Sequence, residues 1–475
     1  MSTSAVVSLP QAHTKAMSDA RAGLRLGIGM VVTSLVLLIF VQYALPPEAH
    51  AHYWGLNPEG MRQFRSHWGL SNLPTLGMDS YSLAFRLLLV VLWSGYALAI
   101  LSAKQGATLE TKPISVLIVV TTLLTALFAP PLLSHDVYAY AAHGRLATLY
   151  GLNPYFHLPS FLARVHDPAA AYITWNWPTV YGPVWTRIEA SSIFLLREQG
   201  LWAQVIVLKA IEAGALMGAA FAGRRIAACV SPGRENLTLL AIGLNPLLLL
   251  EGPGSGHNDL LMACLFLIGV MFYVEKKYVW AALFLGGSVG IKLVTLAVLP
   301  WAWMEWARAR SWRERILGGA AAVILTLLPT VVCYVGLWHG AATLASLHAR
   351  ALYNLSAATL QENASVAIWL QSHGVGASAA GILVTLFQNR WILGAFALLT
   401  LWQAIRPRPA RWLTAWGTLS ALLMLSAMGL PFPWYISWFW PVCLLRWDKV
   451  GMGLSAACFG LSLLWVSGYA VMSSY

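Results

Sequence analysis

Long apolar runs separated by short polar segments dominate the hydrophobic pattern of this 475-residue chain. Each run is continuous and close to the roughly 20 residues that an α-helix needs to cross a bilayer. Because backbone groups in lipid must form their hydrogen bonds internally, the pattern predicts membrane-spanning helices. We expect these helices near residues 26–45, 81–102, 114–133, 201–222, 237–252, 259–274, 316–338, 379–404, 412–430, 434–446 and 450–472.

The apolar segment 279–304 differs from the others because glycines interrupt its middle. It lies between two groups of basic residues that we expect on one side of the membrane, so it must cross twice or enter and return. We predict two short half-helices that meet near Gly286-Gly287 and Gly290, with Lys292 at or near the outer apex. A lysine at the centre of an unbroken spanning helix costs about 3 kcal/mol, and a break that lines a cavity lowers this cost.

Composition supports a polytopic membrane protein. Hydrophobic residues make up 58% of the chain and charged residues only 10%, whereas a soluble domain carries about 25% charged residues. The net charge of +12 does not indicate nucleic-acid binding, because Lys and Arg form short clusters between the apolar runs. Such clusters mark the cytoplasmic side and, with the N-terminus inside, predict about 12–13 crossings. Residues 1–24 are expected to form a disordered cytoplasmic tail, and residues 134–200 a large extracytoplasmic loop.

The polar and aromatic residues of this topology gather on its outer side, beginning with the stretch SHDVYAYAAHGR. If a helix begins at Asp136, then Tyr140 and His143 share a face with it, and Tyr138 and Arg145 share another. A carboxylate at the start of a helix is often a simple cap, and that alternative stays open here. The stretch GSGHND can likewise be a turn in which Asn258 or Asp259 caps the next helix.

Two charged residues lie inside the predicted helix 201–222. Lys209 and Glu212 are three positions apart, which places them on one side of a helix. We expect them to form a structural ion pair, because charges inside spanning helices usually pair with each other.

An acid at the outer membrane face, aromatic rings and isolated basic residues suit the transfer of a sugar from a polyprenyl phosphate. A basic residue would offset the charge of the phosphate leaving group. The carboxylate would act as general base on the acceptor hydroxyl. The donor's lipid tail would stay in the bilayer, and the sequence shows no nucleotide-binding motif.

Several stretches resemble the polyprenol-phosphomannose-dependent mannosyltransferases of bacteria, which belong to the GT-C superfamily of glycosyltransferases. They are SHDVYAYAAHGR, GLNPY, YGP, GHNDLLMACLFLIGV, GGSVGIKLVTLAVLP and PWYISWFWPV, and the resemblance as a whole spans about residues 114–446. The likeness is greatest to the α-1,6-mannosyltransferases. It implies an all-α polytopic enzyme of the bacterial plasma membrane that inverts the anomeric carbon and acts on a glycan or glycolipid acceptor outside the cytoplasm. The metal requirement varies among such enzymes, and we predict neither a metal nor a cofactor here.

The resemblance also implies roles for individual residues. Asp136 matches the catalytic base, while Lys292 and Arg145 are expected at the donor phosphate. Substrate-binding positions would be Tyr138, Tyr140, His143, Asn153, Tyr155, Tyr181, His257, Asn258, Trp434 and Tyr435. In much of the superfamily the acid follows the first helix, whereas here it follows the third predicted one. The chain would then divide into the tail 1–24, a catalytic transmembrane module 25–340 and a C-terminal transmembrane module 341–475.

Other interpretations stay open at the level of sequence. A transporter or flippase of lipid-linked sugars would show internal repeats and broken helices at the bilayer midplane. A GT-C enzyme could also transfer arabinose or glucose, or use another acceptor. A non-catalytic assembly subunit would not need Asp136. The sugar, acceptor, linkage and oligomeric state are not determined by these patterns.

Overall fold

The computed structural model describes residues 8–45, 58–131, 134, 136–173, 176–308, 310–346, 371–372, 374–379, 389–405, 413–419, 433–447, 449 and 452–460. Within these residues the secondary structure is helical, apart from one isolated bridge between His339 and Ala341. The predicted all-α fold class is confirmed. The helices predicted at 412–430 and 450–472 lie largely outside the described residues.

The helical elements follow one another in a single series, in which α denotes an α-helix and η a 3₁₀-helix, except that η3 is a π-helix. They are α1 (Ser8–Tyr43), α2 (Pro58–His67), α3 (Met78–Lys104), α4 (Thr111–Phe128), α5 (Asp136–Leu149), α6 (Phe161–Arg164), η2 (Pro168–Tyr172), α7 (Pro183–Leu195), α8 (Leu201–Val230), α9 (Glu235–Gly243), α10 (Pro246–Leu249), η3 (Leu250–Gly254), α11 (Asp259–Val274), α12 (Tyr278–Val289), η4 (Leu293–Val298), α13 (Leu299–Ala307), α14 (Trp312–Tyr334), η5 (Ala342–Leu344), α18 (Asn389–Ile405), η6 (Pro433–Trp438) and α20 (Trp440–Cys443).

Five helices of the described residues are long and apolar enough to cross a membrane: α1, α3, α4, α8 and α14. A sixth span is possible if α9 and the α10–η3 segment, which meet at a bend of 47°, count as one. Shorter apolar helices such as α11 and α12 pack among them. The predicted polytopic architecture is therefore confirmed, whereas the number of about 12–13 crossings stays a prediction.

The first helix starts earlier than expected. It begins at Ser8, so the expectation of a disordered tail through residue 24 is wrong from Ser8 onward. The segment is rich in alanine and other good helix formers, such as Gln11, Lys15 and Met17. Extending an existing helix costs much less than nucleating one, so the apolar span 26–45 carries the helix back into this polar segment.

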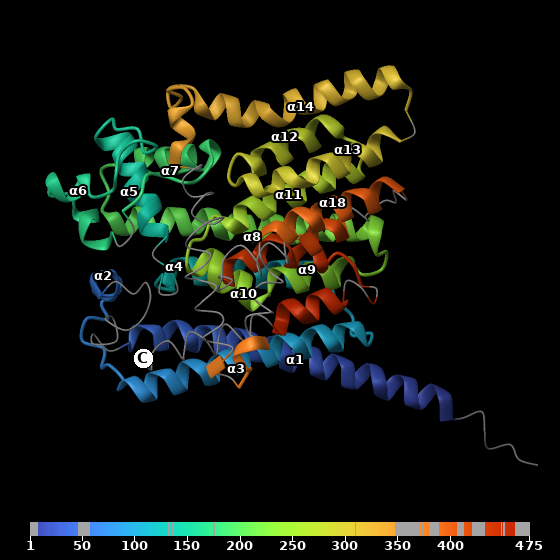
Figure 1. Cartoon of the computed structure of the whole chain (residues 1–475). Coiled ribbons are helices and arrows are strands. Elements are labelled where there is room, and N and C mark those ends of the chain that lie inside the picture. The colour runs from blue at the N-terminus through green and yellow to red at the C-terminus, as the bar shows by residue number, and fades with distance from the viewer. Residues whose placement is uncertain are drawn as a thin grey trace, which may run out of the picture.

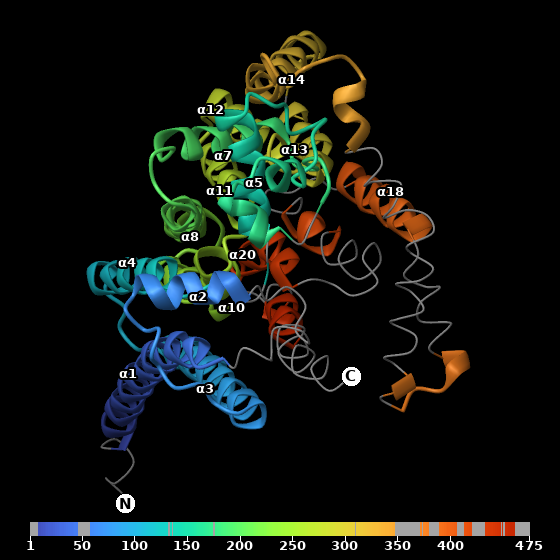
Figure 2. The ribbon, with the colours of Figure 1, turned by 90° about the vertical axis from the view of Figure 1, so that its left-hand side faces the viewer.

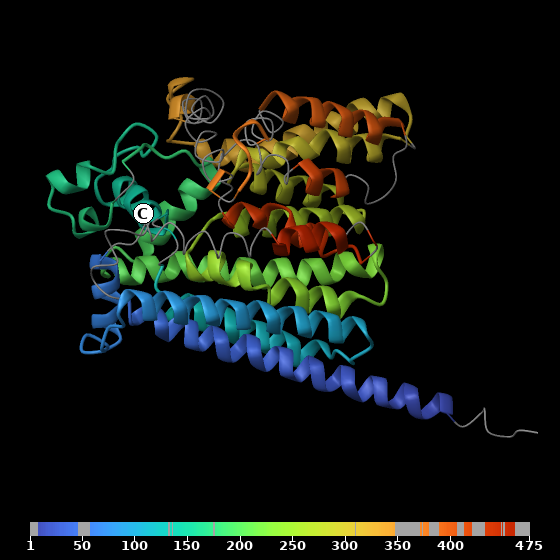
Figure 3. The same ribbon diagram turned by 60° about the horizontal axis from the view of Figure 1, so that its bottom comes forward.

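The helices stack in layers between the α1–α3 hairpin and α14 (Figure 1). Figure 3 shows most of them running along the same direction, with α8 near the centre of the stack. The elements α5, α6 and α7 gather at one end of this bundle, and α1 begins at the other end (Figure 1). Viewed along the bundle, α5 and α7 lie in front of α11, α12 and α13 (Figure 2).

The glycine-interrupted segment forms the expected broken structure. Helix α12 ends at Val289, and the 3₁₀-helix η4 begins at Leu293 and leads into α13. Gly290, Ile291 and Lys292 therefore lie in the break between two helical halves. By contrast, the continuous helix expected over 434–446 is wrong, because η6 and the short α20 occupy this segment. Pro441 lacks the N–H that a continuous helix requires and instead lies in the first turn of α20.

The two charged residues inside α8 cap other helices. Lys209 donates to the carbonyl of Ala129 at the C-terminal end of α4. Glu212 accepts from the backbone N–H of Leu261, in the first turn of α11, at 3.0 Å. Each charge faces the helix end of opposite partial charge. The expected Lys209–Glu212 ion pair is thus wrong, and these side chains instead fix the ends of α4 and α11 beside the polar cluster described next.

Candidate active site

Asp136 begins α5 and turns its carboxylate toward residues from other parts of the chain. Its Oδ2 atom accepts hydrogen bonds from the hydroxyls of Tyr140 at 3.4 Å and Tyr181 at 3.3 Å. The Nδ1 atom of His257 lies 3.4 Å from the same oxygen. The carboxylate stays 28% exposed, whereas His257 is 1% exposed. An acid in this position can reach a ligand while buried donors hold it from behind.

The environment of Asp136 favours the ionised form. Burial, the largest influence, raises the pKa of this carboxyl, because low polarity disfavours charge. The contact with His257, the positive charge of Lys292 and the Tyr181 hydroxyl outweigh it and lower the pKa to about 2. Asp136 is therefore negatively charged at physiological pH and able to accept a proton.

His257 reaches Asp136 through an unusual turn. After α10 the chain forms the π-helix η3, and Gly256 follows with a φ of 80°. A Cβ atom on Gly256 would lie 2.9 Å from Val137, the neighbour of Asp136. Gly256 thus supplies both the left-handed backbone and the close approach. The His257 ring stacks on Trp434 with centroids 4.0 Å apart, which fixes the plane of the imidazole.

Lys292 lies in the break between α12 and η4 and pairs with Asp259 in the first turn of α11. Its Nζ atom is 2.5 Å from Asp259 Oδ1, and the Lys292 side chain is 15% exposed. Trp438 donates its indole N–H to the same carboxylate oxygen. Aromatic rings of Tyr181, Tyr435 and Trp438 surround the ammonium at 5.5, 5.4 and 5.8 Å from their centroids. The result is a cation held in a partly open aromatic enclosure.

Two of the motifs pair through their backbones. The N–H of Gly182 donates to the carbonyl of Ile291 at 2.9 Å, and that of Val184 donates to the carbonyl of Gly290 at 3.0 Å. These bonds attach the YGP motif to the GIK motif and so hold Tyr181 beside Lys292. The hydroxyl of Tyr155 donates to the Tyr181 carbonyl at 2.9 Å and supports the same loop.

The Gly182–Gly290 contact yields a prediction, because a Cβ on Gly182 would lie 2.6 Å from the carbonyl carbon of Gly290. Gly182→Ala must push the YGP and GIK motifs apart, and we expect activity to fall roughly 100-fold, the cost of a shift of about 1 Å at a reacting centre. The measurement is the rate of sugar transfer by membranes with matched protein levels. Gly200→Ala is the control, since Gly200 has the same extended backbone before a helix but open space around it. Equal activities of the two variants would contradict this role of the contact.

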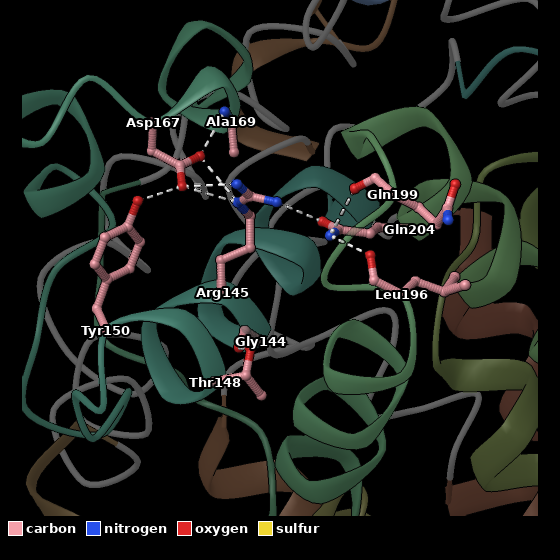
Figure 4. A network of polar contacts seen from close by, with 9 residues as sticks. All are labelled: Gly144, Arg145, Thr148, Tyr150, Asp167, Ala169, Leu196, Gln199 and Gln204. Carbon is pink, nitrogen blue, oxygen red and sulfur yellow. Dashed lines mark hydrogen bonds and ion pairs between the residues drawn. The ribbon is translucent and has the colours of Figure 1, made fainter.

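Arg145 belongs to a separate buried network (Figure 4). Its Nε and Nη2 atoms donate to the Asp167 carboxylate at 2.8–3.0 Å, and Nη1 donates to Gln204 at 2.8 Å. The Tyr150 hydroxyl and the Ala169 N–H also donate to Asp167. Asp167 and Gln204 together accept hydrogen bonds from all three guanidinium nitrogens of Arg145. Arg145 therefore connects the loop that contains Asp167 to α8. For this reason we do not include Arg145 among the residues proposed to bind the donor phosphate, although the sequence led us to expect it there.

This network leads to a stability prediction. Asp167→Asn leaves the buried Arg145 without a counter-charge, which costs about 3–5 kcal/mol, so thermal unfolding in detergent should occur at a clearly lower temperature. Arg145, with Tyr150, keeps the pKa of Asp167 below its ordinary value of 3.8 although burial raises it. The ionised carboxylate therefore contributes its full stabilisation above that value and loses it as the pH falls through the lowered pKa. Removing the exposed Arg197–Glu198 pair with Arg197→Ala is the control and should change little.

Four of the other predicted site residues, Tyr138, His143, Asn153 and Asn258, are not among the hydrogen-bond partners of the Asp136 carboxylate. His143 is buried, its Nε2 contacts the carbonyl of Trp177 at 3.1 Å, and burial lowers its pKa to about 4. Tyr138 stacks on Tyr172, and Asn153 donates to the carbonyl of Leu337 at 2.8 Å. These three support the loop in the structure. Asn258 is fully buried and makes no cap hydrogen bond at α11.

The structure also adds three residues that the sequence patterns did not single out for the site: Glu251, Asp259 and Trp438. Asp259 lies in the GSGHND stretch, where the sequence leaves a helix cap open, and Trp438 lies in the PWYISWFWPV stretch without an assigned role. Glu251 carries a weak signal, because an acid inside the apolar run 237–252 is expensive unless it has a partner. No group of three or more His, Cys, Asp or Glu in the described residues is placed to hold a metal ion, and metal independence stays a prediction.

The fold and the site together define a multi-pass helical membrane protein with a polar, aromatic-lined site at one end of its bundle. A family model described as "Alpha-(1->6)-mannopyranosyltransferase, N-terminal domain" matches residues 59–308. Because this match covers more than half of the chain, the protein belongs to the α-(1→6)-mannopyranosyltransferase family. The family assignment from the sequence motifs is confirmed.

Two curated relatives carry the name alpha-(1->6)-mannopyranosyltransferase A. The one from Mycobacterium tuberculosis is 25% identical over 332 residues, which cover 66% of this chain and 61% of the relative. The one from Corynebacterium glutamicum is 27% identical over 183 residues, which cover 37% of this chain and 35% of the relative. The chain thus matches about three fifths of the length of the first relative. No solved structure matches the chain.

Proposed function

We propose that this protein is an inverting mannosyltransferase that moves mannose from a polyprenyl-phosphate donor to a hydroxyl of a glycan or glycolipid acceptor. The proposal rests mainly on one observation: Asp136 and Lys292 both contact the side chain of Tyr181. The Tyr181 hydroxyl bonds to the acid, and the Tyr181 ring faces the ammonium. An acid and a cation at this spacing can act on opposite sides of one sugar.

In this reaction Asp136 is the general base. The acceptor oxygen attacks the anomeric carbon and forms the new glycosidic bond while its proton passes to the Asp136 carboxylate. The bond between that carbon and the phosphate oxygen breaks, and its electron pair leaves with the phosphate. Attack opposite the leaving group inverts the carbon, so a β-linked donor yields an α-mannoside.

Lys292 is the residue proposed to face the phosphate. In the structure Asp259 already pairs with its ammonium, so the phosphate would share Lys292 with Asp259. The carboxylate fixes the direction of the amine, and a fixed cation stabilises developing negative charge without reorganisation in the transition state. The rings of Trp434, Tyr435 and Trp438 would pack on the apolar faces of the sugars.

The proposed orientation places this site outside the cytoplasm, in the plasma membrane of a bacterium. The end of the bundle that holds α5 and α7 lies opposite the end at which α1 begins (Figure 1). The connection between α13 and α14, with Arg308 and Arg310, lies at the N-terminal end (Figure 1). Basic connections at one end and the site at the other agree with the positive-inside pattern.

A reconstituted assay tests the function. Purified protein in proteoliposomes should transfer mannose from polyprenyl-phosphate-mannose to an α-mannoside acceptor, and methylation analysis of the product should show a 1→6 linkage. Polyprenyl-phosphate-arabinose and polyprenyl-phosphate-glucose serve as matched donors. Transfer from one of these alone would replace mannose as the substrate, and movement of the lipid-linked sugar across the bilayer without transfer would indicate a flippase.

A further inference from the structure

Behind Asp136, the imidazole of His257 lies between two carboxylates. Its Nδ1 atom is 3.4 Å from Asp136 Oδ2, and its Nε2 atom is 3.6 Å from Glu251 Oε2. The three groups therefore form a line that runs from the open end of the site into the bundle. Asp136 is the member nearest the ligand space, with 28% of its side chain exposed, while Glu251 is 4% exposed.

The inner part of this line has unused hydrogen-bonding capacity. Neither ring nitrogen of His257 nor the Oε2 atom of Glu251 forms a hydrogen bond among the described residues. Buried polar groups are normally satisfied, and exceptions often mark functional sites. The ring nitrogens of His257 lie close to two carboxylates without bonding to them. This arrangement suits three groups that form hydrogen bonds to one another when His257 takes up a proton.

The backbone holds Glu251 and His257 as a unit. Glu251 lies in the π-helix η3, and its carbonyl accepts from the His257 N–H at 3.1 Å. The Gly256 N–H donates to the Gly252 carbonyl at 2.7 Å and closes the same turn. One compact turn thus aligns the Glu251 carboxylate with one side of the imidazole and leaves the other side facing Asp136. π-helical turns of this kind are frequent at functional sites.

We propose that Glu251 is a positioning residue of the transfer reaction, which acts through His257 on Asp136. In the reacting state Glu251 accepts the Nε2–H of His257, which requires their 3.6 Å separation to shorten. The lone pair of Nδ1 then faces Asp136 and can take over the acceptor's proton. This inference rests on the proposed function and names the route by which the proton leaves the catalytic base.

The acceptor O–H bond breaks, its electron pair forms the bond to the anomeric carbon, and the proton passes to Asp136. From there the proton moves to Nδ1 of His257, which becomes an imidazolium with one N–H toward each carboxylate. Asp136 regains its negative charge, and the imidazolium releases its proton to water after the product has left. Glu251 stabilises the imidazolium, as the carboxylate of an acid–histidine pair does in other enzymes.

The surroundings of Asp136 favour this transfer. Two neighbours that do not depend on the tautomer of His257, the Lys292 charge and the Tyr181 hydroxyl, favour the ionised form of Asp136 and so favour passing the proton on. His257 is the adjacent group that can receive it. The charged and titratable groups of the cluster that contains His257 come from four elements and two loops. They are Asp136 and Tyr140 on α5, Glu251 on η3, Glu212 on α8, which acts on Asp259, Asp259 on α11, Tyr181 before α7 and Lys292 after α12.

The test is a double-mutant cycle in the reconstituted assay. Glu251→Gln should lower kcat by about 10- to 100-fold, with the KM for the donor changed by less than about three-fold, because the residue touches no substrate. In the His257→Ala background the same substitution should change kcat by less than about two-fold, since its effect passes through the imidazole. Glu189→Gln is the matched control: it also replaces a buried carboxylate by an amide, lies in α7, and should retain activity.

A pH profile separates positioning from a purely structural role. Glu251→Gln removes a negative charge from the cluster behind Asp136, so the acidic limb of the kcat profile should move to lower pH in this variant. If this variant does not fold, Glu251→Asp, which keeps the charge, should fold and retain part of the activity. Equal kcat in Glu251→Gln and the unaltered protein would overturn the proposal, as would an undiminished effect in the His257→Ala background or an unshifted profile. Failure of the unaltered protein to transfer mannose would instead overturn the proposed function.

Discussion

Replacing Asp136 with asparagine should abolish sugar transfer while the protein still folds and enters the membrane. The carboxamide occupies nearly the same space but cannot accept the acceptor's proton, and loss of a general base costs about 10²- to 10⁴-fold in rate. The measurement is the initial rate of mannose transfer in proteoliposomes with matched amounts of protein. A surface carboxylate provides the control: Asp79→Asn, in the exposed first turn of α3, should have the rate of the unaltered protein.

The Asp136→Asn substitution is expected to leave the local structure nearly unchanged. The hydroxyls of Tyr140 and Tyr181 can still donate to the amide oxygen, so the local hydrogen bonds survive the change. Thermal unfolding in detergent should therefore differ little from that of the unaltered protein. Retained turnover by this variant would exclude Asp136 as the base and would leave the site without its proposed catalytic group.

The second large effect is expected for Lys292→Ala, which removes the cation proposed to face the donor phosphate. We expect kcat to fall about 10²- to 10³-fold, the usual cost of losing one group that stabilises transition-state charge. The KM for the polyprenyl-phosphate donor should also rise, while the KM for the acceptor should stay nearly constant. Steady-state kinetics with each substrate varied in turn measures both constants. Lys277→Ala is the matched control, because Lys277 is an exposed lysine beside Glu275.

The Lys292→Ala substitution also changes the surroundings of Asp259, the ion-pair partner of Lys292. Removing the lysine leaves the buried Asp259 carboxylate, 1% exposed, without its charge partner, and an uncompensated buried charge destabilises a protein. The double variant Lys292→Ala with Asp259→Asn removes this charge and should fold better while remaining inactive. A defect confined to the acceptor in either variant would contradict the placement of the donor phosphate at Lys292.

Part of the candidate site could be predicted because its residues lie in short motifs with uncommon polar content. Asp136, Tyr181, His257 and Lys292 come from four separate motifs, and the structure brings these four together. The same reasoning from uncommon polar residues placed Arg145 at the donor phosphate, where the structure shows other partners for it. The guanidinium of Arg145 is the kind of group that binds phosphate. In the folded chain, however, it bonds to Asp167 and Gln204, which lie 22 and 59 positions away in sequence.

Local pattern by itself determined the fold class, the positions of the long apolar helices and the break before Lys292, because each depends on hydrophobic length or on nearby glycine. Only the tertiary structure decided which charges meet. Lys209 and Glu212 are neighbours on one helix but cap different helices, while Glu251 reaches His257 through a π-turn that no periodicity reveals. The physical reason is that a partner for a buried charge is selected by spatial proximity after the helices have packed, and sequence spacing constrains that proximity only within one helix.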